Sequence, residues 1–224
     1  MDYERFIIDT INKMSGRYTA YRVFSDWVAM TAIAISNAVT LRKEVKDSRE
    51  EQYKNISSRY RAEELRIFGD MTGALALAFE DQFRDILGDI YMKTGCGSKS
   101  TGQFFTPYHL SYLMAALGFD SHIKEIEDCN EITLNEPSTG GGGSLIAFAQ
   151  VMKEHGYDYQ KQLRVVAQDL DWNGVYMTYI QMSLLGIKAT VVQGDTLGEP
   201  YTKGYDEMRV LYGLGDVYKR QVLL

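Results

Sequence analysis

The chain has 224 residues, of which 45% are hydrophobic and 24% are charged, and its formal net charge is −6. This length allows one large domain or two small ones with a hydrophobic core. The negative net charge excludes the class of basic proteins that bind duplex DNA by themselves. A function on DNA would therefore need a partner subunit or a missing segment to supply much of the contact.

The first part of the chain, residues 1–98, is predicted to be a helical N-terminal domain. Residues 23–39 are apolar on nearly all faces, which predicts a buried helix. Residues 41–66 are dense in Lys, Arg and Glu at helical spacing, which predicts one long solvated helix. Helical periodicity returns over residues 71–92 and predicts a further helix.

Three basic side chains of the second predicted helix allow two interpretations. Arg59, Arg61 and Arg66 could contact phosphate groups, or they could form the charged surface of a helix. The surface interpretation is favoured because Glu63 and Glu64 lie among them.

A turn-rich stretch at residues 94–102 predicts a linker, and residues 99–224 are predicted to form a second domain. Its first helix is expected to start with Thr106 as the N-cap and Pro107 at the first helical position. The apolar residues on one face of that helix are Leu110, Leu113, Met114 and Leu117.

Beyond this helix, short apolar runs alternate with helical patterns. Strands are predicted at residues 131–135, 163–167 and 188–192, and helices at residues 145–154 and 173–185. Such alternation is typical of a parallel sheet with crossover helices, so the predicted class is α/β with a Rossmann-like second domain.

The most informative segment is a glycine loop between the first predicted strand and its helix. It reads Glu136-Pro137-Ser138-Thr139-Gly140-Gly141-Gly142-Gly143-Ser144. Consecutive glycines allow positive φ and a close approach of the backbone to a ligand. At the carboxyl end of a first parallel strand, this predicts a nucleoside cofactor site; a merely flexible connection is the alternative.

Two acidic residues end the next two predicted strands. Asp169 ends the second, where a carboxylate can accept hydrogen bonds from ribose hydroxyls. Asp195 ends the third, where a carboxylate can accept a hydrogen bond from an adenine amine. Either acid alone reads as a turn residue or a helix cap, but both together after a glycine loop favour cofactor binding.

Four segments in this order resemble one family. The segment Gly102-Gln103-Phe104-Phe105-Thr106-Pro107, the glycine loop, Ala167-Gln168-Asp169 and Gly194-Asp195-Thr196-Leu197 are similar to those of adenine N6 DNA methyltransferases. The likeness is greatest to the modification subunit of type I restriction–modification systems. It covers residues 99–197 and implies S-adenosyl-L-methionine as cofactor, DNA as substrate and a separate specificity subunit as partner.

The resemblance also implies roles for individual residues. The methionine part of the cofactor would lie against the first segment, the glycine loop would pass under its amino acid moiety and ribose, and the two acids would bind ribose and adenine. The alternatives are that Thr106 and Pro107 cap a helix and that the phenylalanines only pack. The implied cofactor-binding residues are Phe104, Thr106, Pro107, Glu136, Ser138, Gly140, Gly142, Asp169 and Asp195.

The glycine loop departs from the family pattern at three positions. The family has Asp or Asn where Glu136 stands, Thr or Ser where Gly141 stands, and Phe where Ser144 stands. We therefore expect a looser, less well packed loop than the family's, with a consequence for affinity.

The family's catalytic Asn/Asp-Pro-Pro-Phe/Tyr segment is absent from the sequence. It should follow a fourth strand, predicted at residues 204–212, but the last proline is Pro200. The absence indicates either a fragment of a longer methyltransferase, which we favour because the residues after 212 do not read as the end of such a domain, or a degenerate member without turnover. No catalytic residue is assigned.

The leading function is thus S-adenosyl-L-methionine-dependent adenine N6 methylation of DNA. The alternatives are a non-catalytic cofactor-binding or assembly subunit of a DNA-modification complex, and a nucleotide-dependent oxidoreductase on a similar sheet. The oligomeric state is left open.

The sequence also predicts a cytoplasmic protein without a membrane span or a metal site. The longest apolar run, residues 28–39, is too short to cross a bilayer, and the acidic N-terminus lacks the pattern of a signal peptide. Cys96 and Cys129 have no metal-ligand spacing and are predicted to be free thiols.

Overall fold

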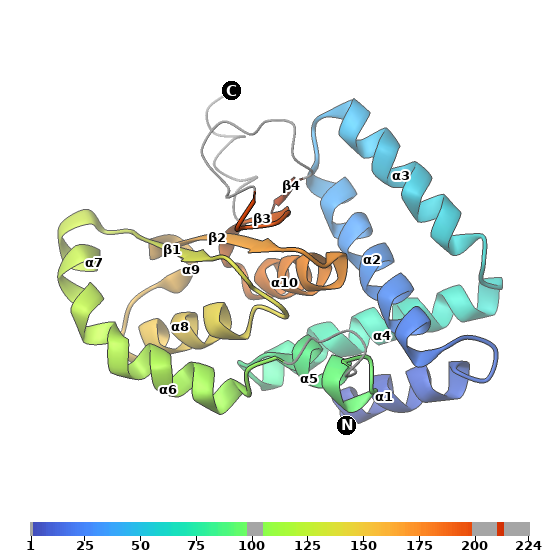
Figure 1. The fold of residues 1–224 in the computed structure, drawn as a ribbon, viewed down its shortest axis with the longest axis horizontal. Coiled ribbons are helices and arrows are strands. Elements are labelled where there is room, and N and C mark those ends of the chain that lie inside the picture. The colour runs from blue at the N-terminus through green and yellow to red at the C-terminus, as the bar shows by residue number, and fades with distance from the viewer. Residues whose placement is uncertain (1, 98–104, 199–209, 213–224) are drawn as a thin grey trace. The chain divides into compact units, whose positions relative to one another are not determined.

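The computed structural model describes residues 2–97 and 105–198, together with the backbone of residues 210–212. The chain divides into two compact units (Figure 1). The first comprises Met1–Gln82 and Ile86–Phe104, and the second comprises Phe83–Asp85 and Phe105–Leu224. The second unit therefore includes a three-residue segment that interrupts the first.

The first unit consists of helices in its described part. Their bounds are α1 (Tyr3–Met14), α2 (Ala20–Val39), α3 (Lys43–Ser57), α4 (Ala62–Asp81) and α5 (Ile86–Lys93). The side chains of Asp2 and Thr19 cap α1 and α2 by accepting backbone N–H groups at 3.0 and 3.1 Å. Fully buried aromatic side chains, among them Trp27 and Tyr91, form the core.

Two of the helix predictions in this unit are wrong in extent. The predicted helix at 41–66 is two helices, because α3 ends at Ser57 and α4 begins at Ala62. The predicted helix at 71–92 is also broken, between Asp81 and Ile86. Neither break contains glycine or proline; a buried side chain lies in each, Tyr60 in the first and Asp85 in the second. The buried helix predicted at 23–39 is confirmed as α2.

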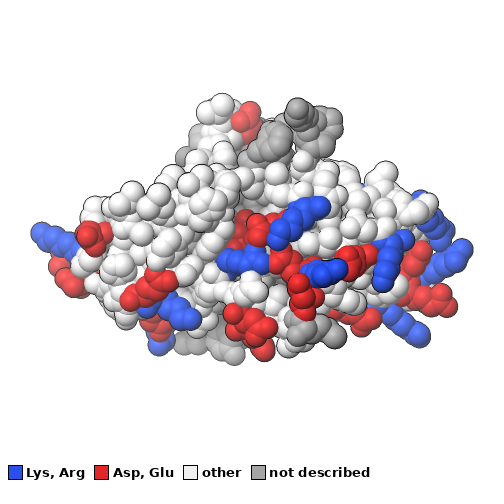
Figure 2. Space-filling view, turned by 90° about the horizontal axis from the view of Figure 1, so that it is seen from below, with Lys and Arg blue, Asp and Glu red and all other residues white. Residues whose placement is uncertain are grey.

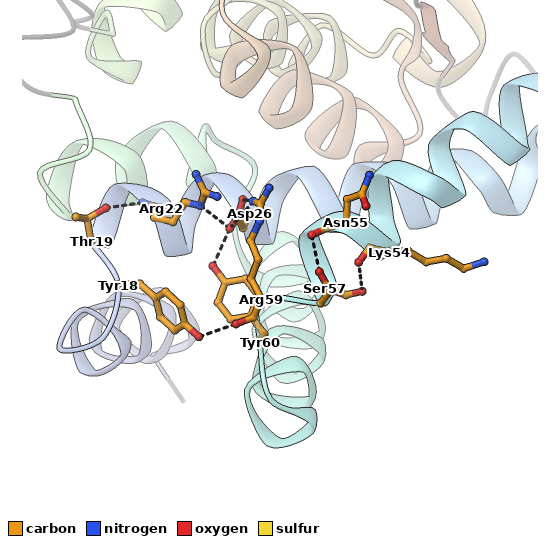
Figure 3. Close-up of polar contacts among 10 residues, drawn as sticks. Tyr18, Thr19, Arg22, Asp26, Lys54, Asn55, Ser57, Arg59 and Tyr60 are labelled. Atoms are coloured by element: carbon orange, nitrogen blue, oxygen red, sulfur yellow. Dashed lines mark hydrogen bonds and ion pairs between the residues drawn. The ribbon is translucent and has the colours of Figure 1, made fainter.

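A buried carboxylate joins α2 to the turn between α3 and α4 (Figure 3). The Asp26 carboxylate accepts hydrogen bonds from Arg22 Nε at 2.9 Å, from Arg59 at 3.2 Å and from the Tyr60 hydroxyl at 2.9 Å. Burial, followed by the charge of Asp26, raises the pKa of Tyr60. Arg59 therefore has a structural partner, which supports the surface interpretation over a phosphate contact for this residue.

The second unit combines helices with a small sheet. Its elements are α6 (Tyr108–Gly118), the 3₁₀ turn η1 (Phe119–His122), α7 (Ile123–Cys129), β1 (Ile132–Glu136), α8 (Gly143–Glu154), α9 (Tyr159–Gln162), β2 (Leu163–Asp169), α10 (Trp172–Leu185), β3 (Lys188–Gln193) and β4 (Val210–Tyr212). The strands lie in the order β1-β2-β3-β4, and β1, β2 and β3 are parallel. This confirms the predicted parallel sheet and the alternation of strands and helices.

The fourth strand departs from the parallel pattern. Only residues 210–212 of the predicted strand at 204–212 are described, and they pair antiparallel to β3, with Val191 opposite Leu211. A short return strand can pair antiparallel without the crossover helix that a parallel strand requires.

The crossover helices α8 and α10 lie on the same side of the sheet (Figure 1). Connections between parallel strands are right-handed. Because β2 lies next to β1, and β3 lies next to β2 on its other side, two right-handed connections place both helices on the same face of the sheet. The sheet side chains Ile132, Val165 and Ala167 are buried, while Thr133 and Asn135 of β1 are exposed. α10 is buried on almost all sides, so its polar residues need partners within the protein.

Helix α6 starts one residue later than predicted. Pro107, not Thr106, occupies the N-cap position, and no side chain caps the helix, which begins at Tyr108. The predicted apolar face is exposed, with Leu117 78% accessible. The helix packs on α8 through other residues: the Tyr108 hydroxyl donates to Gln150 at 2.5 Å.

One face of the surface is drawn in Figure 2. On the face drawn in Figure 2, the Lys and Arg side chains of the described residues are interspersed with Asp and Glu. Within the described ranges, no helix is long and apolar enough to cross a membrane. Cys96 and Cys129 are free cysteines, as predicted, and Cys96 is buried.

Candidate functional site

The candidate site lies where the three parallel strands end. The loops that follow β1, β2 and β3 meet at the carboxyl edge of the sheet, which is where ligands bind in open α/β sheets. The Thr196 hydroxyl donates to the Pro137 carbonyl at 2.6 Å, and the Gly194 N–H donates to the Asp169 carbonyl at 3.0 Å. These bonds join the third loop to the first two.

The glycine loop has a backbone that only glycine adopts readily at two positions. Gly140 has φ +52° and Gly142 has φ +90°. The loop also lies tightly against α10: a Cβ on Gly142 would be 3.2 Å from Thr178 Oγ1, and that hydroxyl donates to the Gly140 carbonyl at 3.0 Å. The loop is thus an ordered turn with defined partners, unlike a flexible connection.

The segment before α6 meets the glycine loop through Phe105. A Cβ on Gly140 would be 2.8 Å from Phe105 Cδ1, so the ring lies directly on the Gly140 backbone. Thr106 and Pro107 are exposed, and Phe104 lies outside the described residues. Among the described residues of this segment, Phe105 is therefore the one that lies against the loop, although the resemblance pointed to its neighbours.

Two of the residues that depart from the family pattern bind each other. The Ser144 hydroxyl donates to Glu136 Oε2 at 2.6 Å, and the Ser138 N–H donates to Glu136 Oε1 at 3.3 Å. The longer side chain at 136 reaches across the loop to a hydroxyl at the start of α8. This bond ties the two ends of the loop together, so the expectation of a loose loop is not supported at these positions.

Asp169 is fixed by the backbone of two loops. One carboxylate oxygen accepts the Gly140 N–H at 2.7 Å and the other accepts the Asp171 N–H at 2.9 Å. Burial raises the pKa of Asp169, and these two hydrogen bonds counteract part of that shift. Since each carboxylate oxygen has two lone pairs, both can still accept a hydrogen bond from a ligand hydroxyl.

Asp195 is the most accessible of the predicted acids. Its side chain is exposed, and its Oδ1 accepts the Leu197 N–H at 3.0 Å in a local turn. Next to Asp169, the apolar side chain of Leu170 is 69% exposed. Sequence reasoning missed Leu170, although a leucine that follows a strand-end acid in a loop is an available cue.

Two further residues at the loop were not predicted. The Gln181 amide donates to the Gly141 carbonyl and to Asp85 Oδ1, the latter at 2.7 Å. Both Gln181 and Asp85 are buried. Gln181 could have been noticed in the sequence as a polar residue in a mostly apolar helix. Asp85 lies in a sequence that reads as helix and gives no such indication.

A comparison with protein-family models identifies one family. The family model described as N-6 DNA Methylase matches residues 82–212, which is more than half of the chain. The chain is also similar to a solved type I restriction-modification system methyltransferase subunit from Streptococcus thermophilus, with 12% sequence identity and a TM-score of 0.46. That similarity covers 91% of this chain and 60% of that subunit, so this chain spans less than two thirds of its length. No curated protein matches the chain.

Proposed function

Because the chain belongs to the N-6 DNA methylase family, we propose that it binds S-adenosyl-L-methionine at the carboxyl edge of its sheet, for N6 methylation of adenine in DNA. The observation that carries the proposal is the Asp169 carboxylate held by the Gly140 N–H at 2.7 Å. This bond brings the glycine loop and the acid of the second strand into one site. A cofactor with a nucleoside part and a charged amino acid part would contact both at once.

The residues of the site have the chemistry that this cofactor needs. The ligand would carry a positive sulfonium and a positive amino group, and Glu136, Asp169 and Asp195 supply negative charge at the ends of the three strands. Gly140 and Gly142 have the positive φ values that glycine adopts readily, and glycine adds no side chain of its own to the loop.

We assign the roles as follows. Glu136, Ser138, Gly140 and Gly142 bind the amino acid moiety and the adjoining ribose edge, and Asp169 accepts from the ribose hydroxyls. Asp195 accepts from the adenine amine, and the exposed Leu170 covers one face of the purine. Phe104, Thr106 and Pro107 flank the methionine part.

When bound, the cofactor supplies an electrophilic methyl group on sulfur. What the chain contributes is orientation, because a methyl transfer to an amine requires the nitrogen to be aligned with the carbon–sulfur bond. The target adenine also has to leave the DNA stack to reach the site. We propose DNA as the substrate because of the family match, and a specificity subunit as partner because a chain with a net charge of −6 needs further contacts to hold DNA.

A second candidate function is supported by the sequence itself. The three prolines are Pro107, Pro137 and Pro200, so the 224 residues contain no Asn-Pro-Pro-aromatic segment to hold a flipped adenine. The alternative is a non-catalytic subunit that binds the cofactor or assembles with a catalytic chain.

Calorimetric titration tests cofactor binding directly. The 224-residue chain should bind S-adenosyl-L-methionine and not NAD. Asp195→Ala should weaken binding about tenfold, as expected for the loss of one hydrogen bond to a charged acceptor. The matched control is Asp120→Ala, which alters an exposed acid in η1 and should leave the affinity unchanged. Binding of NAD alone would overturn the proposal.

A methylation assay then separates the two candidates. Labelled cofactor is incubated with unmethylated DNA and the chain, with and without a specificity subunit. Incorporation into DNA identifies a methyltransferase, and cofactor binding without incorporation identifies the non-catalytic alternative.

A further inference from the structure

The short connection between α4 and α5 belongs to the second unit and contacts several of its elements. The Phe83 ring packs edge-on against Tyr159, with ring centroids 5.3 Å apart. The Phe83 carbonyl accepts a hydrogen bond from the Tyr108 hydroxyl of α6 at 3.2 Å. These contacts fix the position of Asp85, two residues further on.

Asp85 is connected to the glycine loop through Gln181. The side chain of Asp85 is buried, and its Oδ1 accepts a hydrogen bond from Gln181 Nε2 at 2.7 Å. The same nitrogen donates to the carbonyl of Gly141. The amide of Gln181 therefore joins the carboxylate of the α4–α5 connection to the backbone of the glycine loop.

The other oxygen of Asp85 lies at the start of α8. A Cβ on Gly143, the first residue of this 12-residue helix, would be 2.9 Å from Asp85 Oδ2. The first N–H groups of a helix have no partner within it, and a negative charge at that end is favourable. Any side chain larger than hydrogen at position 143 would push the Asp85 carboxylate away. This explains why the last residue of the glycine run is also glycine.

A buried carboxylate in this place is otherwise costly. Removing an ionised group from water is unfavourable unless hydrogen bonds and charges compensate, and an apolar side chain of similar size would often be more stable. Asp85 also contributes, after burial, to the raised pKa of Tyr108 at the start of α6. Its charge is thus felt by three helices around the site, α6, α8 and α10.

We propose that Asp85 is a positioning residue of the cofactor site: through Gln181 and the N-terminus of α8, its carboxylate keeps Gly141, Gly142 and Gly143 in the shape that binds the cofactor. Asp85 touches the loop and not the ligand. The inference rests on the proposed function, in that the loop is the cofactor-binding loop.

The test combines loop exchange with cofactor affinity in the whole 224-residue chain. Asp85→Asn keeps the shape but places an amide where a carboxylate faces the start of α8. Hydrogen exchange of the peptide that spans the glycine loop should become about tenfold faster without ligand, and the S-adenosyl-L-methionine Kd should rise about tenfold. Exchange elsewhere in the second unit should stay as in the wild type.

The matched control is Asp89→Asn. Asp89 is a half-exposed acid of α5, four residues further on, paired with Lys93 at 3.7 Å. In Asp89→Asn, the hydrogen exchange of the glycine-loop peptide and the S-adenosyl-L-methionine Kd should both equal those of the wild type. Gln181→Met should act in the same direction as Asp85→Asn, and the double variant should show less than the product of the two effects, because both act through the Gly141 carbonyl.

Each result decides the proposal. An unchanged Kd and unchanged loop exchange in Asp85→Asn overturn it, and so does an increase of exchange spread over the whole second unit, which indicates a general structural role. If Asp85→Asn does not fold, Gln181→Met is judged by the same criteria. If the wild type binds no S-adenosyl-L-methionine, the proposed function fails, and loop exchange alone then shows whether Asp85 orders the loop.

Discussion

Replacing Gly174 by alanine tests whether Asp169 is held as the structure describes. Gly174 lies in the first turn of α10, where alanine would normally stabilise a helix by about 1 kcal/mol over glycine. Here, however, the added Cβ would be 2.8 Å from Asp169 Cγ and 2.9 Å from its Oδ2. The sign of the effect therefore depends on whether the carboxylate can move.

The expected magnitude follows from what the carboxylate would lose. Reaching an ordinary carbon–carbon separation requires a shift of roughly 0.7 Å. Such a shift strains the hydrogen bonds from the Gly140 and Asp171 N–H groups, now 2.7 and 2.9 Å long. Hydrogen bonds to a charged group contribute about 1.5 to 3 kcal/mol each, so losing most of both outweighs the helix gain and leaves a net loss of about 2 to 4 kcal/mol.

The assay is urea unfolding followed by tryptophan fluorescence. The chain has two tryptophans, Trp27 in the first unit and Trp172 in the second, so a Trp27→Phe background reports the second unit alone. The cofactor Kd of Gly174→Ala should rise together with the loss of stability, because the displaced carboxylate is proposed to bind the ribose.

Gly73→Ala is the matched control for this prediction. Gly73 is exposed in α4, and a Cβ there meets nothing within 4 Å, so this change should stabilise the first unit by up to about 1 kcal/mol. In this case Trp172→Phe leaves Trp27 as the reporter. If Gly174→Ala stabilises as Gly73→Ala does, the carboxylate is not fixed and the reasoning is refuted.

Three further predictions concern other polar groups. Because burial raises the folded-state pKa of Asp169, its contribution to stability is present below its unfolded pKa of about 3.9 and is lost as pH rises through the folded pKa. The stability of wild type relative to Asp169→Asn in urea unfolding should therefore fall as pH rises above about 4, and a rise would contradict the assignment. Glu136→Gln and Ser144→Ala should each weaken cofactor binding, with a coupling of about 1 kcal/mol in a double-mutant cycle, because both alter one hydrogen bond; strictly additive effects would exclude the loop tie. Asp26→Ala should destabilise the first unit by about 1 to 3 kcal/mol in the same fluorescence assay. The loss is limited because its arginine partners are 42% and 49% exposed and can be hydrated in the variant. The variant should also have a lower pKa of Tyr60 in a spectroscopic titration, and an unchanged pKa of Tyr60 would contradict the network.

The sequence was sufficient for the sheet and for the family because both depend on local patterns. Apolar runs near residues 132, 163 and 188 are bounded by turns, and β1, β2 and β3 formed there with the expected parallel pairing. The resemblance to adenine N6 methyltransferases, based on four short segments, is confirmed by the family match over residues 82–212. The roles of the individual site residues stay predictions.

The helix boundaries of the first unit were not predictable in the same way. The breaks after Ser57 and Asp81 carry no glycine or proline, so periodicity continued through them. What ends those helices is tertiary: Tyr60 turns inward to the Asp26 carboxylate, and Phe83 packs on Tyr159. A single sequence does not reveal a contact with a distant partner.

The same limit applies to the site. Asp169 and Asp195 could be found because strand ends are recognisable, and Gly140 and Gly142 because glycine runs are rare. Asp85 could not, since its partner Gln181 is 96 residues away. Phe105 was given no cofactor role, with packing left as an alternative for both phenylalanines, and its ring lies on the Gly140 backbone.

The separation between Asp85 and Gln181 has a consequence for biosynthesis. During translation, residues 83–85 leave the ribosome long before α10, so the Asp85 side chain stays hydrated until Gln181 has also been made. Closing a loop of this length is slow compared with forming the local helices. A nascent chain would therefore acquire its helices first and an ordered glycine loop late, which would delay cofactor capture until α10 has been synthesised.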